Sequence, residues 1–583
     1  MVMKTLTPET SSVETSPRRS RAVVATAVAI LVAVGAAIGF WAVTGDGGPV
    51  AAEDARIELT FTGDDASYLG DREIIEGPAE AVLINDSSAP VWFILEYFVP
   101  GSAALNLDRY PEGTDFFPNE DLAGAARLMD VFEPGRVTQP IRLEPGTYIV
   151  EAAVADGGAP HVWRFAVIEV VSDGGSSDDL APADVPSVSF REGDVPGVRV
   201  WQLPDSPGGY QPDQSWLAVG SDPDGNIYVS GHDHLLNSML YRLDPDTGSL
   251  TWVGDARTAS SSADNWEPGE TAEKFHTRPT YHDGRVYVAT LDKSSIDDAF
   301  LSTRGFHWYA YDLESGDFVD LSADEPDGVG AKRLQVVTIS ADSVNNRIYG
   351  MTIPENRLLY YDVAQGQTTV VGTPDRWKWD YFYSNRFMWT DSRGSVYMTG
   401  GTERSQWNQG ENRAVLDSVW RYTADTGFED TGFALEALAA IEVGQWNSAH
   451  DTLYVSDDMG HIYRFIDATA TWEYIGRPDF PAGETSTGFN KVWVFQLDPG
   501  EETIYLGRSD NSGRPNEIWE FDIDTGRSSI LAVLPELDAL AGSEAFITGY
   551  DSWDDEGNFY ISAFSMYDSE NAYLIGLNPE QIR

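Results

Sequence analysis

The sequence contains no cysteine among its 583 residues and few basic side chains. The missing thiols exclude disulfides, thiol nucleophiles, iron–sulfur clusters and every cysteine-ligated metal site. Only 38 Lys and Arg stand against 93 Asp and Glu, so the formal net charge is −55. A chain this acidic repels phosphate backbones, and no basic run provides a local exception, so we expect no nucleic-acid partner.

The chain is nevertheless rich in material for a folded core. Hydrophobic residues make up 42% of the sequence and aromatic residues 12%. That composition excludes a disordered acidic protein, and the length corresponds to more than one ordinary domain. We therefore expect a folded, multidomain protein.

Residues 22–43 carry no charged side chain, a length that crosses a hydrocarbon core of ~30 Å as one helix. Three arginines between positions 18 and 21 precede this stretch, and acidic residues follow it. The positive-inside rule then predicts a cytoplasmic basic tail over 1–21 and a transmembrane signal anchor over 22–44. The protein would lie in the cell membrane as a single-pass protein with its C-terminal domains outside the cytoplasm. The alternative is a cleavable signal peptide, with a cleavage site among Val50, Ala51 and Ala52.

Residues 53–171 show short segments of alternating hydrophobicity, such as Arg56-Ile-Glu-Leu-Thr-Phe61, which predict a small β-sandwich. The segments LINDSSAPVWF and LEPGTY resemble the cupredoxin-like sandwich of exported proteins. Type-1 copper needs Cys and usually two His, whereas this region holds only His161, so the resemblance implies the fold without its copper. We interpret His161 as a polar turn residue. An acidic linker rich in Gly, Ser and Pro follows over 172–190.

The C-terminal region, 195–583, contains an internal repeat. Its copies share a turn and a short strand, as in DGNIYVSG, DGRVYVAT and EGNFYISA. The repeated tyrosines are Tyr228, Tyr287, Tyr349, Tyr397, Tyr454, Tyr505 and Tyr560, which lie 48 to 62 residues apart. This period fits one four-stranded propeller blade, with each tyrosine on the second strand. Aromatic strands that end in acidic turns, such as those at Tyr241 and Trp519, are the predicted third strands.

The last repeat is one strand short, whereas an extra strand, VRVWQL, begins at Val198 before the first repeat. We predict that this strand completes the last blade and removes two free sheet edges. The fold class is thus all-β: an N-terminal transmembrane helix, a small β-sandwich and a seven-bladed β-propeller closed by an N-terminal strand. The repeats resemble those of NHL, YVTN and gluconolactonase-like propellers, a resemblance that concerns the fold and not the function.

Cations gather in the predicted loops that lead into the first strand of each blade. They are His276 with Arg278, Lys332 with Arg333, Arg386 and Lys491. In so acidic a chain, positive charge focused at one mouth of the channel would attract an anionic ligand. The alternative is that each cation simply pairs with a nearby carboxylate.

Two further groups belong to the same predicted face. Trp377 and Trp379 alternate with polar residues, so their rings would share one side of an extended segment and could stack on sugars or simply pack under a loop. His232 and His234 have strand spacing and would form half of a metal site if His276 or His282 joined them. We favour ordinary loop histidines, and predict neither a metal nor another cofactor.

No nucleophile elbow, zinc-protease motif, phosphate-binding loop or EF-hand loop is present. The Asp-Gly stretches fall at the repeat turns, where a turn role suffices. We therefore expect a binding or scaffold module for a small anionic or carbohydrate ligand or a protein partner. The alternative is a lyase or lactonase acting on an acidic sugar or lactone, because similar repeats occur in streptogramin and oligogalacturonate lyases, which place His and Arg at this mouth. That resemblance implies His276 as the base, with Arg278, Arg386 and Lys491 stabilising negative charge.

Overall fold

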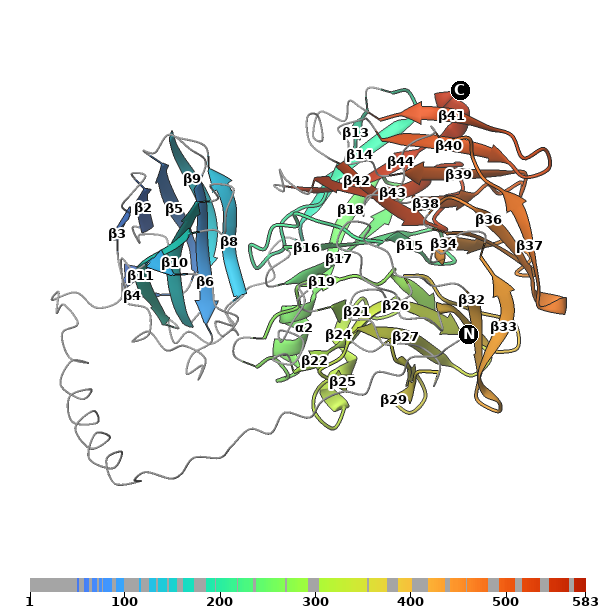
Figure 1. Cartoon of the computed structure of the whole chain (residues 1–583), viewed down its shortest axis with the longest axis horizontal. Helices are drawn as coiled ribbons and strands as arrows, with labels where there is room; N and C mark the ends of the chain where they lie inside the picture. The colour runs from blue at the N-terminus through green and yellow to red at the C-terminus, as the bar shows by residue number, and fades with distance from the viewer. Residues whose placement is uncertain are drawn as a thin grey trace, which may run out of the picture.

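The computed structural model describes the strands within residues 50–171 and most of residues 185–583 (Figure 1). Inside the second range the undescribed positions are 194, 218, 234–236, 268–269, 292–303, 354–355, 375–385, 401–417, 436–440, 458, 481–491, 509–515, 535–544 and 566–570. The predicted anchor over 22–44 and the linker over 172–190, apart from its last six positions, lie outside the described residues. Among the described residues, no helix is long and apolar enough to cross a membrane.

The N-terminal body consists of two β-sheets (Figure 1). The first has the order β1 (Val50–Ala51), β4 (Glu73–Ile75), β11 (His161–Val171), β10 (Gly146–Val154), β6 (Val91–Phe98) and β8 (Ala125–Phe132), with β7 (Asp115–Phe116) also on β11. The second has the order β3 (Ala66–Gly70), β2 (Ile57–Phe61), β5 (Gly77–Asn85) and β9 (Gly135–Leu143). In β2 the apolar residues Ile57, Leu59 and Phe61 are buried and alternate with half-buried polar residues, as the sequence pattern predicts.

His161 does not lie in a turn. It is the first residue of β11 and pairs with Val154 in the antiparallel ladder with β10. The preceding Pro160 suggested a turn, but the alternating apolar residues that follow carry the strand back to His161.

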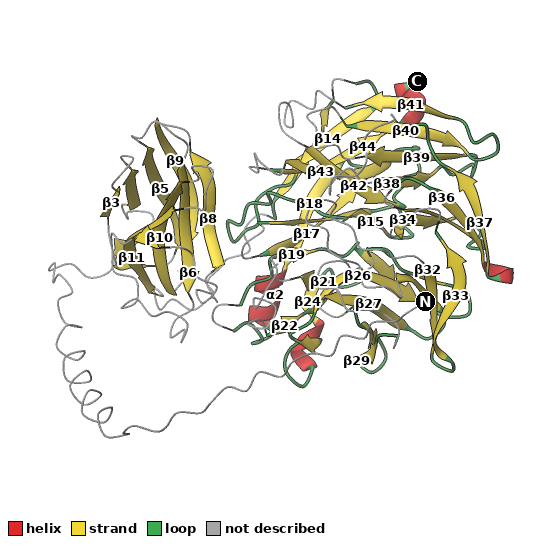
Figure 2. Ribbon diagram, viewed as in Figure 1, coloured by secondary structure: helices red, strands yellow, loops and turns green. Residues whose placement is uncertain are grey.

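The C-terminal body is a β-propeller built of antiparallel four-stranded sheets that follow one another along the chain (Figure 2). The four-stranded units are β15 (Val219–Ser221), β16 (Ile227–His232), β17 (Ser238–Asp244) and β18 (Ser249–Asp255); β20 (Thr280–His282), β21 (Arg285–Leu291), β23 (Trp308–Asp312) and β24 (Phe318–Asp320); β26 (Gln335–Asp342), β27 (Arg347–Ile353), β28 (Leu358–Asp362) and β29 (Gln367–Gly372); β30 (Trp389–Thr390), β31 (Val396–Gly400), β32 (Ser418–Thr423) and β33 (Gly427–Ala434); β34 (Ile441–Trp446), β35 (Thr452–Asp457), β36 (Ile462–Ile466) and β37 (Thr471–Gly476); β38 (Val492–Leu497), β39 (Thr503–Arg508), β40 (Glu517–Asp522) and β41 (Ser528–Val533); and β42 (Ala545–Tyr550), β43 (Phe559–Ser565), β44 (Ala572–Leu577) and β14 (Val198–Gln202).

The first strands of neighbouring sheets lie beside one another and surround a central channel. Contacts join β15 to β20 and β42, β26 to β20 and β30, and β34 to β38 and β42. Strands β38 and β42 even pair in parallel, so their two sheets continue into one. Small residues permit this approach. A Cβ on Gly220 of β15 would lie 2.0 Å from the carbonyl oxygen of Pro279, just before β20.

The propeller closes as the sequence predicts. β14 pairs antiparallel with β44, with Val200 opposite Ile575, so the strand before the first repeat completes the sheet of the last one. The short helix α4 (Pro579–Ile582) follows β44, and the side chain of Arg583 pairs with Glu520 on β40. All the repeated tyrosines lie on second strands and are buried, as predicted.

A recurring Asp-x-x-Gly-x-x-Tyr turn builds several of these hairpins. In the turn that begins at Asp554, one carboxylate oxygen accepts hydrogen bonds from the backbone N–H groups of Glu556 and Asn558 at 3.0 and 2.8 Å. The other oxygen accepts from the side chain of Asn558 at 2.7 Å and from the Tyr560 hydroxyl at 2.6 Å. Asp222, Asp391 and Asp457 accept from Tyr228, Tyr397 and Tyr463 in the same way. These carboxylates are thus satisfied within their own turns.

Candidate functional site

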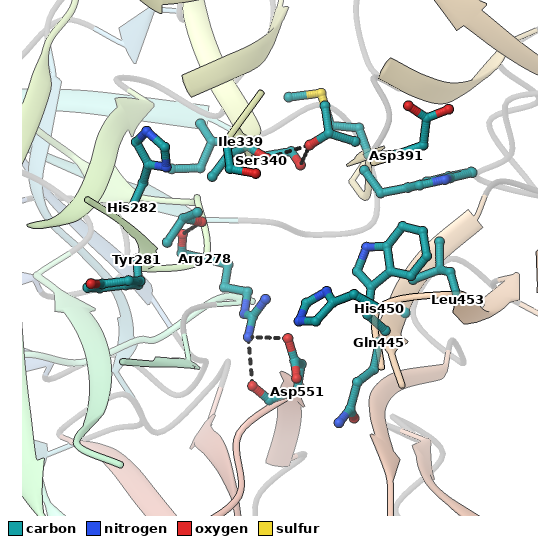
Figure 3. Close-up of a pocket in the computed structure, with 18 of the residues that line it drawn as sticks. Arg278, Tyr281, His282, Ile339, Ser340, Asp391, Gln445, His450, Leu453 and Asp551 are labelled. Carbon is teal, nitrogen blue, oxygen red and sulfur yellow. Dashed lines mark hydrogen bonds and ion pairs between the residues drawn. The ribbon is translucent and has the colours of Figure 1, made fainter. Parts of the chain in front are cut away.

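A cavity of about 840 Å³ lies at the end of the channel where the first strands turn into the second strands (Figure 3). Residues from β20, β26, β30, β34 and β42 and their following turns line it. The first strands all run the same way along the channel, so the ends of these strands meet at one mouth and leave the cavity between them. Its volume is in the range of ordinary small-molecule sites.

Arg278 lies on one wall of this cavity and is held by residues of the two adjacent sheets of the ring. Its Nη2 donates to the carboxylate Oδ2 of Asp551 at 2.9 Å and to the backbone oxygen of the same residue at 2.6 Å. Its Nε donates to the carbonyl of Val219 at 3.2 Å, and its guanidinium lies 4.8 Å from the ring centroid of Tyr550. The charge of Arg278 is therefore already compensated by protein groups.

The other polar groups of the cavity combine carboxylates, amides and hydroxyls with aromatic rings. Asp283 and Asp391 line it in addition to Asp551, so acidic groups outnumber the single guanidinium. Tyr281 and Trp446 are half-buried and leave part of each ring exposed, and the ring of His450 lies 6.1 Å from that of Trp446. Such a lining suits a polar, uncharged molecule with an apolar face.

His282, considered as a metal ligand from the sequence, is one of the cavity residues. Its Nε2 lies 2.7 Å from Oδ1 of Asn346, which follows β26. The hydrogen bond orients the imidazole toward the neighbouring sheet. No group of three or more His, Asp or Glu side chains with the geometry of a metal site occurs in the described part of the chain.

A second polar group lies at the opposite end of the channel, where the first strands begin. His276 is buried, with Nδ1 3.0 Å from the carbonyl oxygen of Val337 and Nε2 2.8 Å from Nη1 of Arg386. Because a carbonyl and a guanidinium fix the two nitrogens, Nδ1 carries the proton and Nε2 accepts from Arg386. Burial, followed by the charges of Arg386 and Lys274, lowers the pKa of His276 well below its ordinary value. The imidazole is therefore neutral.

Arg386 is the centre of this second group. Its guanidinium lies 5.2 Å from the ring centroid of Trp493, and its Nε lies 3.9 Å from a carboxylate oxygen of Glu442. Lys274, on the short strand β19 (Lys274–Phe275), is only 6% exposed. Burial lowers the pKa of Lys274 to about 8 although Glu273 opposes the shift, and Arg386 lowers it further. Lys274 was not among the residues selected from the sequence.

The remaining predicted site residues do not all gather at one mouth. Lys332 lies on β25 (Ala331–Lys332), is exposed, and pairs with Asp327 at 2.7 Å. Arg333 beside it is exposed as well. Arg278, in contrast, lines the cavity at the end of the channel where the first strands end. Lys332 thus pairs with Asp327 and Arg278 with Asp551. For these two residues the alternative holds, in which each cation is neutralised by a nearby carboxylate. His232 is buried at the end of β16. His234, Trp377, Trp379 and Lys491 lie outside the described residues.

The sequence pointed to Arg278 and His282 but not to the cavity's other polar residues. Asn346, Trp446, His450 and Asp551 stand in or beside the turns between first and second strands, which the repeat pattern identified only as turns. These turns directly precede the strands that carry the repeated tyrosines, and this position was the sequence signal that could have identified the residues.

A third buried charged cluster lies away from the channel. His307 precedes β23, and its ring nitrogens lie 2.9 Å from Asp320 Oδ2 and 2.9 Å from Glu270 Oε1. Burial alone would lower the pKa of His307, but the hydrogen bonds to Asp320 and Glu270 outweigh it and raise the pKa to about 9. Arg304 also binds Glu270 at 3.1 Å. With its charges paired internally, this cluster is structural.

No protein-family model matches the sequence, and no curated protein matches it. Three solved structures show a distant likeness in shape. A chain in the crystal structure of the mitotic checkpoint complex has 13% identity and a TM-score of 0.41, over 70% of this chain and 99% of that one. An oligogalacturonate lyase in complex with manganese has 13% identity and a TM-score of 0.42, over 69% and 99%. The β-propeller domain of Myceliophteria thermophila Cps50 (Swd1) has 10% identity and a TM-score of 0.40, over 64% and 98%. Likenesses at this level indicate no activity for the chain described here.

Proposed function

We propose that the protein is a membrane-anchored, extracytoplasmic binding module whose propeller holds a small carbohydrate at the mouth of its channel. In this proposal the propeller has seven blades, and the cupredoxin-like sandwich spaces it from a membrane anchor over residues 22–44. The uncharged stretch and the arginines before it support the anchor.

The observation that carries the proposal is the cavity of about 840 Å³ lined by five sheets. Its half-buried rings, Tyr281 and Trp446, can pack on the apolar face of a sugar, while amides and hydroxyls contact its hydroxyl groups. An anion fits this cavity poorly, because Asp551 already neutralises Arg278 and the carboxylate of Asp283 also lines the wall. We therefore favour a neutral carbohydrate here over the anionic ligand considered from the sequence.

The enzyme alternative is less well supported by the same geometry. His276, the base suggested by the resemblance to lyases, accepts a hydrogen bond from Arg386 through Nε2 and has a pKa well below its ordinary value. A proton acceptor in this position would first have to lose its bond to Arg386. Binding without chemistry needs no such step.

Calorimetric titration of the full-length protein in detergent with neutral mono-, di- and trisaccharides tests the proposed ligand. We expect saturable binding of at least one saccharide, weakened at least tenfold by Trp446→Ala because the stacking surface is lost. Tyr474→Ala removes an exposed aromatic ring from the outer strand β37 and serves as the matched control. Equal binding by Trp446→Ala and the control, or binding of acidic sugars alone, would contradict the carbohydrate assignment.

The anchor is tested separately by cell fractionation. The full chain is expected in the membrane fraction and open to protease added from outside the cell. A variant that lacks residues 22–44 is expected to leave the membrane. Recovery of the full chain as a released protein would instead support cleavage near Ala52.

A further inference from the structure

One wall of the cavity presents a side-chain amide that is held in a single orientation. His282 ends β20, Asn346 lies in the turn after β26, and both line the cavity. Nε2 of His282 lies 2.7 Å from Oδ1 of Asn346. A carboxamide oxygen can only accept a hydrogen bond, so Nε2 carries the proton and the amide cannot flip without losing this bond. The Nδ2 group of Asn346 therefore points away from His282.

The N–H groups of this amide are not used within the protein. In the described part of the chain Nδ2 of Asn346 has no acceptor, and it is not among the buried polar atoms. The backbone is fixed as well, because the carbonyl of Asn346 accepts from the N–H of Val363 at 3.2 Å. Asn346 thus offers a preoriented donor to a ligand in the cavity, and such a donor loses little freedom on binding.

Two tryptophans on other walls of the cavity add neutral donors. Trp389 on β30 is 2% exposed, and its Nε1 is buried without an acceptor among the described residues. Trp446 at the end of β34 is half-buried, and its Nε1 has no acceptor in that part of the chain either. A donor that stays unpaired inside a protein is costly. The lining therefore favours a ligand that contributes a strong but uncharged acceptor.

The carboxylates of the cavity differ in how far they are already used. Asp551 binds Arg278 through Oδ2, and Asp391 accepts from the Tyr397 hydroxyl and from the backbone of its own turn. Asp283 is exposed and forms no hydrogen bond or ion pair within the described residues. It can accept an N–H or O–H group of a ligand.

The same wall also carries apolar groups. Ile339 and Ala341 lie on β26 just before the turn that holds Asn346, and both line the cavity. In Figure 3, Ile339 and His282 lie apart from Asp551. An acetamido group matches this wall, because its carbonyl oxygen accepts, its methyl group is apolar and its N–H can donate. A hydroxyl group would also accept from the amide but has no apolar part.

We propose that the ligand of the cavity is a sugar with an acetamido group, whose carbonyl oxygen accepts from Nδ2 of Asn346. His282 is a positioning residue for Asn346, and Ile339 and Ala341 contact the methyl group. This inference rests on the proposed carbohydrate site and specifies which sugars that site selects.

Calorimetric titration of the full-length protein in detergent with matched pairs of sugars tests the proposal. The pairs are N-acetylglucosamine with glucose, N-acetylgalactosamine with galactose, and diacetylchitobiose with cellobiose, and within each pair only the substituents at carbon 2 differ. We expect at least one acetamido sugar to bind about tenfold or more tightly than its partner, because the partner places neither a carbonyl oxygen on Asn346 nor a methyl group on Ile339.

Asn346→Asp separates hydrogen-bond donation from shape. The change keeps the size of the side chain and the acceptor for His282, and Asp tolerates the same φ of 54°, but it removes the N–H groups. The affinity for the acetamido sugar should fall about tenfold or more, and the affinity for its partner should change much less. Asp264→Asn is the matched control, since Asp264 has the same φ, is exposed and does not line the cavity.

Two variants of His282 test its positioning role. His282→Leu leaves Oδ1 of Asn346 without a donor, so the amide can rotate, and the preference for the acetamido sugar over its partner should fall severalfold. His282→Gln keeps an N–H that can donate to Oδ1 and should retain more of this preference. A purely structural role of His282 would lower the melting temperature without changing the ratio of the two affinities.

The outcomes distinguish this inference from the function on which it rests. Wild-type binding of no sugar in any pair would overturn both. Equal affinities within every pair, or an unchanged preference in Asn346→Asp, would overturn the acetamido assignment and leave the carbohydrate site standing. Circular dichroism melting confirms that each variant is folded. If Asn346→Asp does not fold, Asn346→Gly decides, because glycine adopts the same backbone conformation without strain.

Discussion

Arg278 binds Asp551 across the closure of the propeller: Nη2 lies 2.9 Å from Oδ2. Arg278 leads into the sheet of β20, whereas Asp551 follows β42 in the sheet that contains the closing strand. The same guanidinium also donates to Val219 of the sheet between them. One side chain therefore joins three neighbouring sheets and at the same time forms a wall of the cavity.

Replacement of Arg278 by Met should lower the free energy of unfolding by about 1–3 kcal/mol, because two backbone carbonyls and Asp551 lose their donor. The measurement is urea denaturation of the full-length protein. Arg285→Met is the control, since Arg285 pairs with Asp312 within one sheet and is 42% exposed; such a pair contributes about 0–1 kcal/mol. Equal losses for the two variants would show that the link between sheets adds nothing.

His307 should make stability depend on pH in the alkaline range. Its pKa is raised from 6.5 to about 9 by Asp320 and Glu270 against the effect of burial. A raised pKa stabilises the fold fully below pH 6.5, and this contribution is lost as the pH rises through 9. The same contacts lower the pKa of Asp320 although burial opposes this, so its share is lost at the acidic end, below about pH 4.

We therefore expect the difference in unfolding free energy between the wild type and His307→Gln to be on the order of 3 kcal/mol near pH 6. It should shrink steadily between pH 7 and pH 10. Denaturation curves at several pH values provide the measurement. A difference that is constant over this range would mean that His307 is neutral in the fold.

The aspartate turns should behave as structural units and not as calcium sites. Asp554→Ala leaves two backbone N–H groups and the Tyr560 hydroxyl without their acceptor, which should cost about 1–3 kcal/mol. Tyr560→Phe removes one of these bonds and should cost about 0.5–1.5 kcal/mol. Melting temperatures measured with calcium and with a chelator should agree within error, and a calcium-dependent rise lost in Asp554→Ala would contradict the turn assignment.

Gly220 should tolerate no side chain. A Cβ there would meet the carbonyl oxygen of Pro279 at 2.0 Å, so Gly220→Ala must push β15 and β20 apart at a cost of about 1–3 kcal/mol. Gly500→Ala is the control, because its nearest neighbour is a side-chain atom, the carboxylate of Asp498, and not the backbone of another strand. Thermal melts of both variants decide, with the control expected within about 0.5 kcal/mol of the wild type.

The periodic parts of the fold could be predicted from the sequence because each follows from local chemistry. The repeated tyrosines mark second strands, and the extra strand at Val198 balances the missing strand after Leu577. Both features follow from the alternation of apolar and polar residues and from turn residues, which are patterns that extend over only a few positions of the sequence. The assignment of His161 to a turn was wrong for a related reason, because the local turn signal at Pro160 was given more weight than the alternating strand that begins at His161.

The candidate site was less predictable because its contacts join residues far apart in the sequence. Arg386 meets His276 across two different sheets, and Asp551 meets Arg278 across the closure. The sequence shows which cations enter the channel but not which carboxylate reaches each of them. Lys332 illustrates this, because its position suggested the mouth of the channel although a neighbouring acid, Asp327, holds it at the surface.

The pairing of β14 with β44 also constrains how the protein is made. Strand β14, near the start of the propeller, cannot pair until β44, at its end, has been made. The ring therefore stays open until almost the whole chain has been synthesised. At ~5–20 residues per second the wait is on the order of half a minute. During that time β14 and the first sheet present free edges, which can pair with the same unpaired edge of another nascent chain.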